Sequence, residues 1–231
     1  TYHHEVVGGL YSVIETKSML QITVPMLNQI NVGYSSGKTH PTEKGELNGY
    51  EKIRFRAFSF SSSKDTRNKR FLPTQGTKIT SSIDAGLQSE NGFLKSEANF
   101  QYLHPFKKNI HGLVRWMGQG IHGFDSDIPK SRYVLFGGNS TLRGFREQSF
   151  AATQFQIATF EAAFQPGQGF QTNLFLDVGS KRLVIIENKK IGYGFGLTQL
   201  NEKSLIKVQY ALAFGQGLSN GKLHIKWISR L

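Results

Sequence analysis

One serine of this sequence lies in a pattern that can make its hydroxyl a nucleophile. Gly33, Ser35 and Gly37 match G-x-S-x-G, a motif in which a strand before the serine and a helix after it expose the side chain. Here the polar stretch 38–47 follows instead of an apolar helix. We therefore interpret residues 33–37 as a Gly/Ser loop of a hairpin and expect no catalytic residue and no enzyme activity.

Metal and cofactor chemistry has equally little support. The sequence has no Cys, so neither a thiolate ligand nor a disulfide framework is available. Its His residues lack the spacing that places zinc ligands on one face. Five of them are His3, His4, His104, His111 and His122. We expect neither a metal nor a cofactor.

The formal net charge of +12 raises the question of a nucleic-acid partner. The basic residues are spread thinly, and the densest cluster, at 64–70, contains only four of them. Because no helix carries a basic stripe, we expect no nucleic-acid binding. In a barrel, such cations can line the lumen or face lipid phosphates.

The segment FGGNSTLRGF, residues 136–145, is the strongest candidate for a functional site. It lies in the longest predicted connection of the chain, 119–151. Gly137, Gly138 and Gly144 permit close backbone approach and unusual dihedral angles around Arg143. The plain alternative is a solvated surface loop, since Gly, Ser and Arg are common in loops.

Two carboxylates in later segments fall on the polar face of their predicted strands. Glu161 alternates with Phe160 and Ala162, and Asp177 alternates with Leu176 and Val178. Side chains of a strand point alternately to its two faces, so both carboxylates are expected to point into the lumen of a barrel. They could pair there with inward cations such as Arg115 or Lys207.

The elements that would carry these residues are strands. Apolar and polar residues alternate with period two in segments of about ten residues, separated by Gly, Asn, Ser and Lys turns. The predicted strands are 4–14, 19–26, 28–35, 49–61, 76–88, 93–104, 109–118, 152–165, 169–179, 189–199, 204–214 and 220–229. Short turns are expected at 25–27, 105–107 and 166–168, and longer loops at 35–48, 119–151 and 180–190.

This pattern predicts an all-β fold, an antiparallel transmembrane β-barrel with about twelve strands spanning residues 1–231. The apolar face should meet lipid through side chains such as Phe100, Phe160, Leu174, Phe195, Tyr210 and Ile225. No apolar run approaches the roughly 18 residues of a spanning helix. The chain also starts without a secretory signal, so we expect that one was cleaved or not included and that Thr1 is not the start of the gene.

Four motifs in order resemble the superfamily of outer-membrane assembly and secretion barrels that includes BamA, TamA and FhaC, the bacterial surface antigen family. The 136–145 segment resembles its sixth extracellular loop, with a Gly-Gly pair and a hydrophobic-Arg-Gly-aromatic tetrad. The segments TFEAAF at 159–164 and FLDVG at 175–179 resemble two later strands, and 65–76 resembles the turn ahead of the ninth strand. The resemblance implies that this chain corresponds to the last twelve strands of a sixteen-stranded family barrel, its C-terminal portion.

The resemblance also implies a site and a function. The loop would fold into the lumen and be locked there by Arg143, Gly144 and Phe145 with Glu161 and Asp177, while Leu223, Ile225 and Trp227 would belong to a seam between the first and last strands. The implied function is insertion or secretion of other proteins at the bacterial outer membrane. The implied partners are client proteins, outer-membrane lipid with lipopolysaccharide, and possible periplasmic accessory proteins. A passive pore or receptor, or a barrel that anchors an upstream hydrolase domain, are the alternatives.

Overall fold

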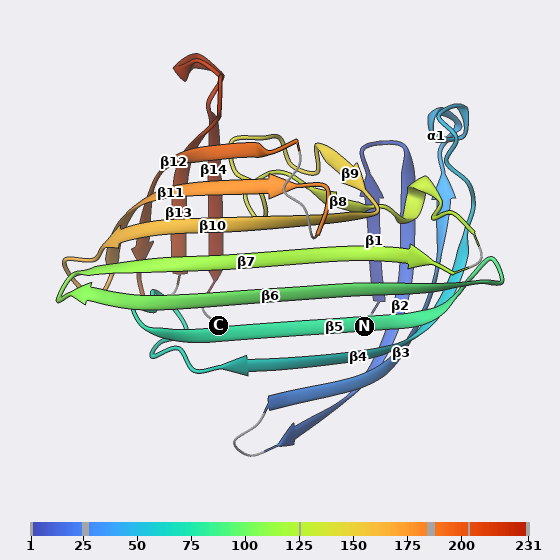
Figure 1. The fold of residues 1–231 in the computed structure, drawn as a ribbon, viewed down its shortest axis with the longest axis horizontal. Coiled ribbons are helices and arrows are strands. Elements are labelled where there is room, and N and C mark those ends of the chain that lie inside the picture. Colours follow the sequence, from blue (N-terminus) through green and yellow to red (C-terminus); the bar gives the residue numbers. More distant parts are fainter. Residues whose placement is uncertain (1, 25–27, 125, 184–187, 203, 230–231) are drawn as a thin grey trace. The chain divides into compact units, whose positions relative to one another are not determined.

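Twelve strands form one sheet in the computed structural model, which describes residues 2–24, 28–124, 126–183, 188–202 and 204–229 (Figure 1). The order is β1 through β7 and then β10 through β14, so each strand lies beside its neighbours in the chain. The strands are β1 (Tyr2–Val7), β2 (Tyr11–Val24), β3 (Asn28–Pro41), β4 (Arg54–Asp65), β5 (Gly76–Gln88), β6 (Asn91–Lys107), β7 (Ile110–Gly123), β10 (Gln154–Phe164), β11 (Phe170–Ser180), β12 (Lys190–Leu200), β13 (Ser204–Ala213) and β14 (Lys222–Ser229). The predicted all-β, antiparallel fold is confirmed.

The remaining elements are short and lie in connections. Helix α1 (Glu43–Leu47) begins after Thr42, whose hydroxyl accepts a hydrogen bond from the Gly45 amide as an N-cap. The connection between β7 and β10 contains the 3-10 helix η1 (Lys130–Arg132) and the paired strands β8 (Val134–Phe136) and β9 (Phe150–Ala152). Another 3-10 helix, η2 (Leu218–Asn220), precedes β14. No helix in the described ranges is long and apolar enough to cross a membrane.

The two faces of the sheet differ in the way that a lipid-facing barrel requires. On β11, Leu174 is 66% exposed, whereas Asp177 is fully buried. Phe195 and Ile225, which share the predicted apolar parity with Leu174, are also more than half exposed. Exposed apolar and buried charged side chains invert the arrangement of a water-soluble sheet, and they support the predicted contact of this face with lipid.

The prediction of the first hairpin was wrong. A single strand was expected at 4–14, but the chain turns at Gly8 and Gly9, both with positive φ, and separates β1 from β2. The expected strand at 19–26 is the second half of β2. Period-two alternation continues on both sides of a tight turn, so the pattern concealed it. The expected turn at 25–27 lies outside the described residues.

Other boundaries also moved because strands extend beyond their apolar alternation. The strand expected at 28–35 continues as β3 to Pro41, so the interpretation of residues 33–37 as a hairpin loop was wrong: they lie inside β3 and pair with β2 and β4. Strand β6 continues through Lys107 where a turn was expected, and β7 reaches Gly123. Backbone pairing needs no apolar side chain, so a strand can continue with polar residues at its ends. The expected 119–151 loop is therefore the 124–153 connection, which we call the long loop.

The chain forms two compact units. Unit 1 comprises Thr1–Lys64, Thr80–Ala98 and Gln119–Val134, and unit 2 comprises Asp65–Ile79, Asn99–Gly118 and Leu135–Leu231. Unit 2 contains β10 to β14 together with the second half of the long loop. This half carries the 136–145 segment, so the candidate site lies within one unit.

Candidate functional site

The 136–145 segment folds into a tight turn that depends on its glycines. The φ angles of Gly137 and Gly138 are 110° and 95°, a region that other residues rarely adopt. The Gly137 amide donates to the Thr141 hydroxyl over 2.8 Å, and the Gly138 amide donates to the Leu142 carbonyl over 2.9 Å. Leu142 is fully buried. The turn therefore holds Arg143 in a fixed place beside the sheet.

Arg143 joins two carboxylates of neighbouring strands. Its Nε and Nη2 donate to the two oxygens of Asp177, each over 2.7 Å, and its Nη1 donates to Glu161 Oε1 over 2.7 Å. The Arg143 backbone amide also donates to Asp177, over 3.1 Å. Only a guanidinium presents donors in this planar fork, so the arrangement is specific to arginine.

A second set of groups holds the two carboxylates. The Thr159 hydroxyl donates to Asp177 over 2.8 Å and accepts from Arg115 over 3.1 Å, and the Asn173 amide donates to Glu161 over 3.1 Å. Arg115 thus reaches Asp177 through Thr159. Direct pairing of Arg115 with the carboxylates was one alternative from sequence, and no such hydrogen bond occurs among the described residues.

The guanidinium also lies on an aromatic ring. The Arg143 Cζ is 3.5 Å from the centre of the Phe175 ring, close enough for a cation–π interaction. Arg143 is 2% exposed and Asp177 is fully buried. Burial alone would lower the pKa of Arg143, but the hydrogen bonds to Asp177 and the charge of Glu161 outweigh burial and raise it. The guanidinium is therefore charged at every physiological pH.

Alternating glycines on β12 make room for the loop. In the register, Asp177 lies opposite Gly192, and Phe175 lies opposite Gly194. A Cβ atom on Gly192 would lie 1.9 Å from the Arg143 carbonyl oxygen. On the loop side, a Cβ on Gly144, whose φ is 89°, would lie 2.6 Å from the Leu212 carbonyl carbon of β13. The loop backbone therefore contacts the backbones of β12 and β13 directly, with no side chain between them.

Aromatic rings pack the loop behind its arginine. Phe136 stacks on Phe155 with ring centres 4.8 Å apart and lies 5.1 Å from Phe150. Phe145, the last residue of the tetrad, makes an edge contact with Phe150 at 5.2 Å. Phe150 belongs to the short strand β9, so this cluster joins the 136–145 segment to the start of β10.

The first half of the long loop has its own anchor, inside unit 1. The Arg132 guanidinium lies 3.8 Å from the centre of the Phe55 ring and 5.0 Å from that of Phe93. The Thr39 hydroxyl lies 3.4 Å from that of Ser131. Burial lowers the pKa of Arg132 to about 10 despite the opposing charges of Glu15 and Asp84, so it remains cationic at neutral pH.

The structure brings most of the predicted site residues together. Arg143, Glu161 and Asp177 meet directly, and Gly137, Gly138, Gly144 and Phe145 shape and pack the segment around them. Leu223, Ile225 and Trp227 lie apart from this cluster, exposed on β14, the last strand in the sheet order. In the described part of the chain, no group of His, Cys, Asp and Glu is arranged to hold a metal ion.

Sequence reasoning missed several contributors. Thr159 and Asn173 share the inward parity of the carboxylates, and this parity was the signal that could have identified them. The strand expected at 189–199 contains the glycines of β12, and no role was expected for them, although their parity places them on the face that Arg143 covers. Arg132 had no recognisable signal, because its contacts come from strands far apart in sequence.

Comparison with known proteins connects this geometry to a family. The chain superposes on BamA from Haemophilus ducreyi with a TM-score of 0.78 at 13% identity, covering 98% of this chain and 56% of that one. It superposes on CdiB from Acinetobacter baumannii with a TM-score of 0.60 at 12% identity, covering 95% of this chain and 41% of that one. The chain thus spans about half the length of these proteins. No curated protein matches it by sequence. The sequence profile of the Omp85 superfamily domain matches residues 23–220, and the chain therefore belongs to the Omp85 superfamily.

Proposed function

We propose that this chain is the C-terminal barrel portion of a protein that inserts other proteins into the bacterial outer membrane or secretes them across it. Membership of the Omp85 superfamily and the similarity to the BamA and CdiB folds support this proposal. Its partners would be client proteins, outer-membrane lipid and periplasmic accessory proteins. We infer the orientation from the family resemblance, in which the 136–145 segment corresponds to an extracellular loop. The long loop would then begin on the extracellular side of the membrane.

The observation that carries the proposal is the fork of Arg143 on Asp177 and Glu161. A loop that served only as a receptor surface would have no need of a buried arginine between two strands. Here the fork fixes the 136–145 segment against β10, β11 and β12. The segment would remain inside the lumen and hold these strands in the arrangement from which clients are released into the membrane.

Exchange of Arg143 for lysine tests this function in the full-length protein. We expect Arg143→Lys to impair client insertion or secretion nearly as much as Arg143→Ala, because lysine keeps the charge but lacks the planar fork. The measurement is the amount of folded, heat-modifiable outer-membrane protein and of secreted protein in cells that depend on the variant.

Arg146 provides the matched control. It lies three residues farther along the same loop and is exposed, so Arg146→Ala should leave client handling unchanged. Normal client handling by Arg143→Ala in a protein that reaches the membrane would contradict the proposal. It would favour a passive pore, a receptor or a barrel that anchors a hydrolase domain.

A further inference from the structure

The outward face of β3 and β4 changes character along the strands. Cross-strand pairs on this face run in steps of two residues from an apolar pair to an aromatic pair, then to a serine–arginine pair and finally to a pair of cations. In order they are Val32 with Phe60, Tyr34 with Phe58, Ser36 with Arg56, and Lys38 with Arg54. Tyr34 and Phe58 make an edge contact, with ring centres 5.6 Å apart. Aromatic residues followed by cations are typical of the boundary between the hydrocarbon core and the lipid headgroups.

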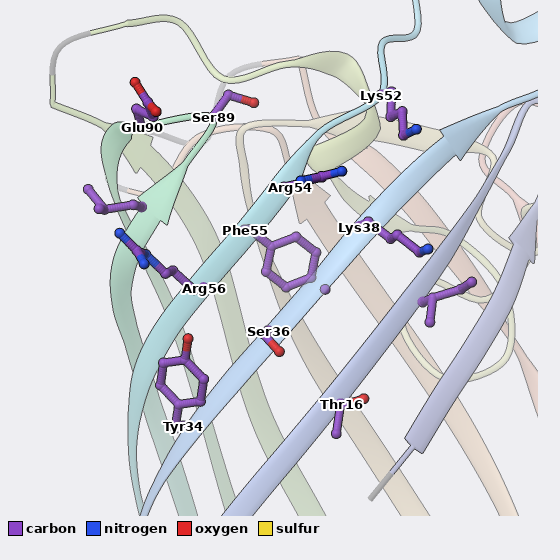
Figure 2. Close-up of a pocket in the computed structure, with 13 residues that line it drawn as sticks. Thr16, Tyr34, Ser36, Lys38, Lys52, Arg54, Phe55, Arg56, Ser89 and Glu90 are labelled. Atoms are coloured by element: carbon purple, nitrogen blue, oxygen red, sulfur yellow. The ribbon is translucent and has the colours of Figure 1, made fainter.

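The cationic end of this gradient opens into a hollow of about 940 Å³. Lys38, Lys52, Arg54 and Arg56 line it, all with exposed side chains (Figure 2). We call these four residues the basic patch. None of them has a side-chain hydrogen bond or ion pair within the described residues, and Glu90 is the one carboxylate in the described lining. The hollow therefore has unpaired positive charge available for an anion.

The basic patch lies at the end of unit 1 where the long loop begins. In this unit the Lys130 ammonium of η1 donates to the Asn48 carbonyl after α1, four residues before Lys52. The Phe124 amide, the first of the long loop, donates to Gly92 at the β5–β6 hairpin, which also contributes Ser89 and Glu90 to the hollow. At about 3.3 Å per residue, Arg54 lies about 13 Å beyond the aromatic ring of Phe58 along β4.

We propose that the basic patch binds the phosphate groups of lipopolysaccharide in the membrane leaflet at this end. The two arginines can each grip a phosphate with a planar fork, and the two lysines add charge. The hydroxyls of Thr16 and Ser36, which also line the hollow, suit a sugar headgroup. The acyl chains would lie along the apolar rows below. The placement in the outer leaflet rests on the orientation given under the proposed function.

Native mass spectrometry of the full-length protein in detergent micelles tests the binding chemistry. Diphosphoryl lipid A is the ligand, and lipid A without its phosphates is the comparison. We expect the protein to bind diphosphoryl lipid A, and we expect Arg54→Gln/Arg56→Gln to raise its apparent Kd about tenfold. Lys38→Gln/Lys52→Gln is the second variant, and circular dichroism checks that each variant retains its β structure.

The control removes the same charge from the other end of β4. Lys64 is exposed on the outward face near the end of the strand, and Lys69 lies in the following connection, so Lys64→Gln/Lys69→Gln should bind lipid A like the unmodified protein. Equal Kd values for control and patch variants would overturn the proposal, as would equal affinity for lipid A without phosphates. Binding of poly-glutamate but not of lipid A would replace the lipid with an acidic protein partner.

A separate measurement distinguishes a wrong orientation from a wrong ligand. Ser89→Cys places a thiol at the rim of the hollow, and an impermeant maleimide should label it in intact cells if this end is extracellular. Lipid A binding in detergent without labelling in cells would leave the phosphate site intact and reject the proposed orientation. Labelling without phosphate-dependent binding would reject the site alone.

Discussion

At the scale of single residues, the arrangement around Arg143 depends on geometry more than on charge. Arg143 hydrogen-bonds to two carboxylates, Asp177 and Glu161, through separate nitrogen atoms of its guanidinium. Desolvating three charged groups is costly, and good geometry is what compensates for that cost. The burial of Arg143 and Asp177 therefore makes the site sensitive to any change that shifts the loop by a fraction of an ångström.

A double-mutant cycle measures this dependence directly. We expect Arg143→Ala and Asp177→Ala each to destabilise the closed loop by up to about 3–5 kcal/mol. The loss should be smaller if water in the lumen reaches the remaining charged groups. The double variant should be far less destabilised than the sum of the two, because either single change already breaks the Arg143–Asp177 interaction. Protease sensitivity of the long loop at Arg146 provides the measurement. Strictly additive effects would show that the two residues do not interact.

The close contact between the loop backbone and β12 gives a second prediction at the scale of single residues. Gly192→Ala should displace the loop, because the new methyl group would lie 1.9 Å from the Arg143 carbonyl oxygen. We expect faster cleavage at Arg146 and weaker client handling, with the strands still folded. Gly167→Ala is the control, since a Cβ there has no neighbour within 4 Å among the residues that the structure describes. Equal cleavage rates in the two variants would mean that the loop does not depend on this contact.

At the scale of elements, period-two alternation predicted the sheet well but not its turns. Twelve strands were expected and twelve form the main sheet, although the first two expected segments divide differently between β1 and β2. The later strands were found because each buries one face and exposes the other, so apolar and polar residues alternate along its sequence. The Gly8–Gly9 turn was missed because alternation continues across it. The paired strands β8 and β9 were also missed, since three residues are too short to show a period.

The same limit applies to the candidate site. Strand parity placed Glu161 and Asp177 on one face, and the loop glycines marked the 136–145 segment as unusual. The partner of each carboxylate came only from the family resemblance, because no local pattern fixes how a long loop meets a distant strand. For the same reason Arg132, whose contacts depend on Phe55 and Phe93, could not be found.

The exposed face of β11 and β12 gives a prediction at this scale. Leu174→Arg should lower the free energy of unfolding by about 2–4 kcal/mol if Leu174 lies near the membrane midplane. Gln199→Arg is the control, because Gln199 lies on the same face at the end of β12, opposite Phe170. There the cost should be about 0–1 kcal/mol. Urea titration in phospholipid vesicles measures both, and similar costs would contradict the assignment of this face to lipid.

At the scale of the whole molecule, the sheet order leaves β14 with a single described neighbour, β13. Leu223, Ile225 and Trp227 are each more than 60% exposed on this strand. In hydrocarbon, an unpaired strand edge costs several kcal/mol for each unsatisfied backbone group. A weakly paired or temporarily open edge would therefore favour the addition of a client strand, which supplies the missing hydrogen bonds.

Site-specific crosslinking along β14 tests this role of the edge. A photoreactive phenylalanine analogue at Trp227 or Leu223 in the full-length protein should crosslink to newly made client barrels, because a client strand that pairs with β14 brings its side chains within reach of these positions. Phe195 provides the control: it is 53% exposed on β12, inside the sheet, and should crosslink mainly to lipid. In the Arg143→Ala variant, we expect the client adducts at β14 to decrease while the adducts at Phe195 stay constant. Equal client crosslinking at Phe195 and β14 would contradict a specific seam and favour nonspecific contact with the barrel wall.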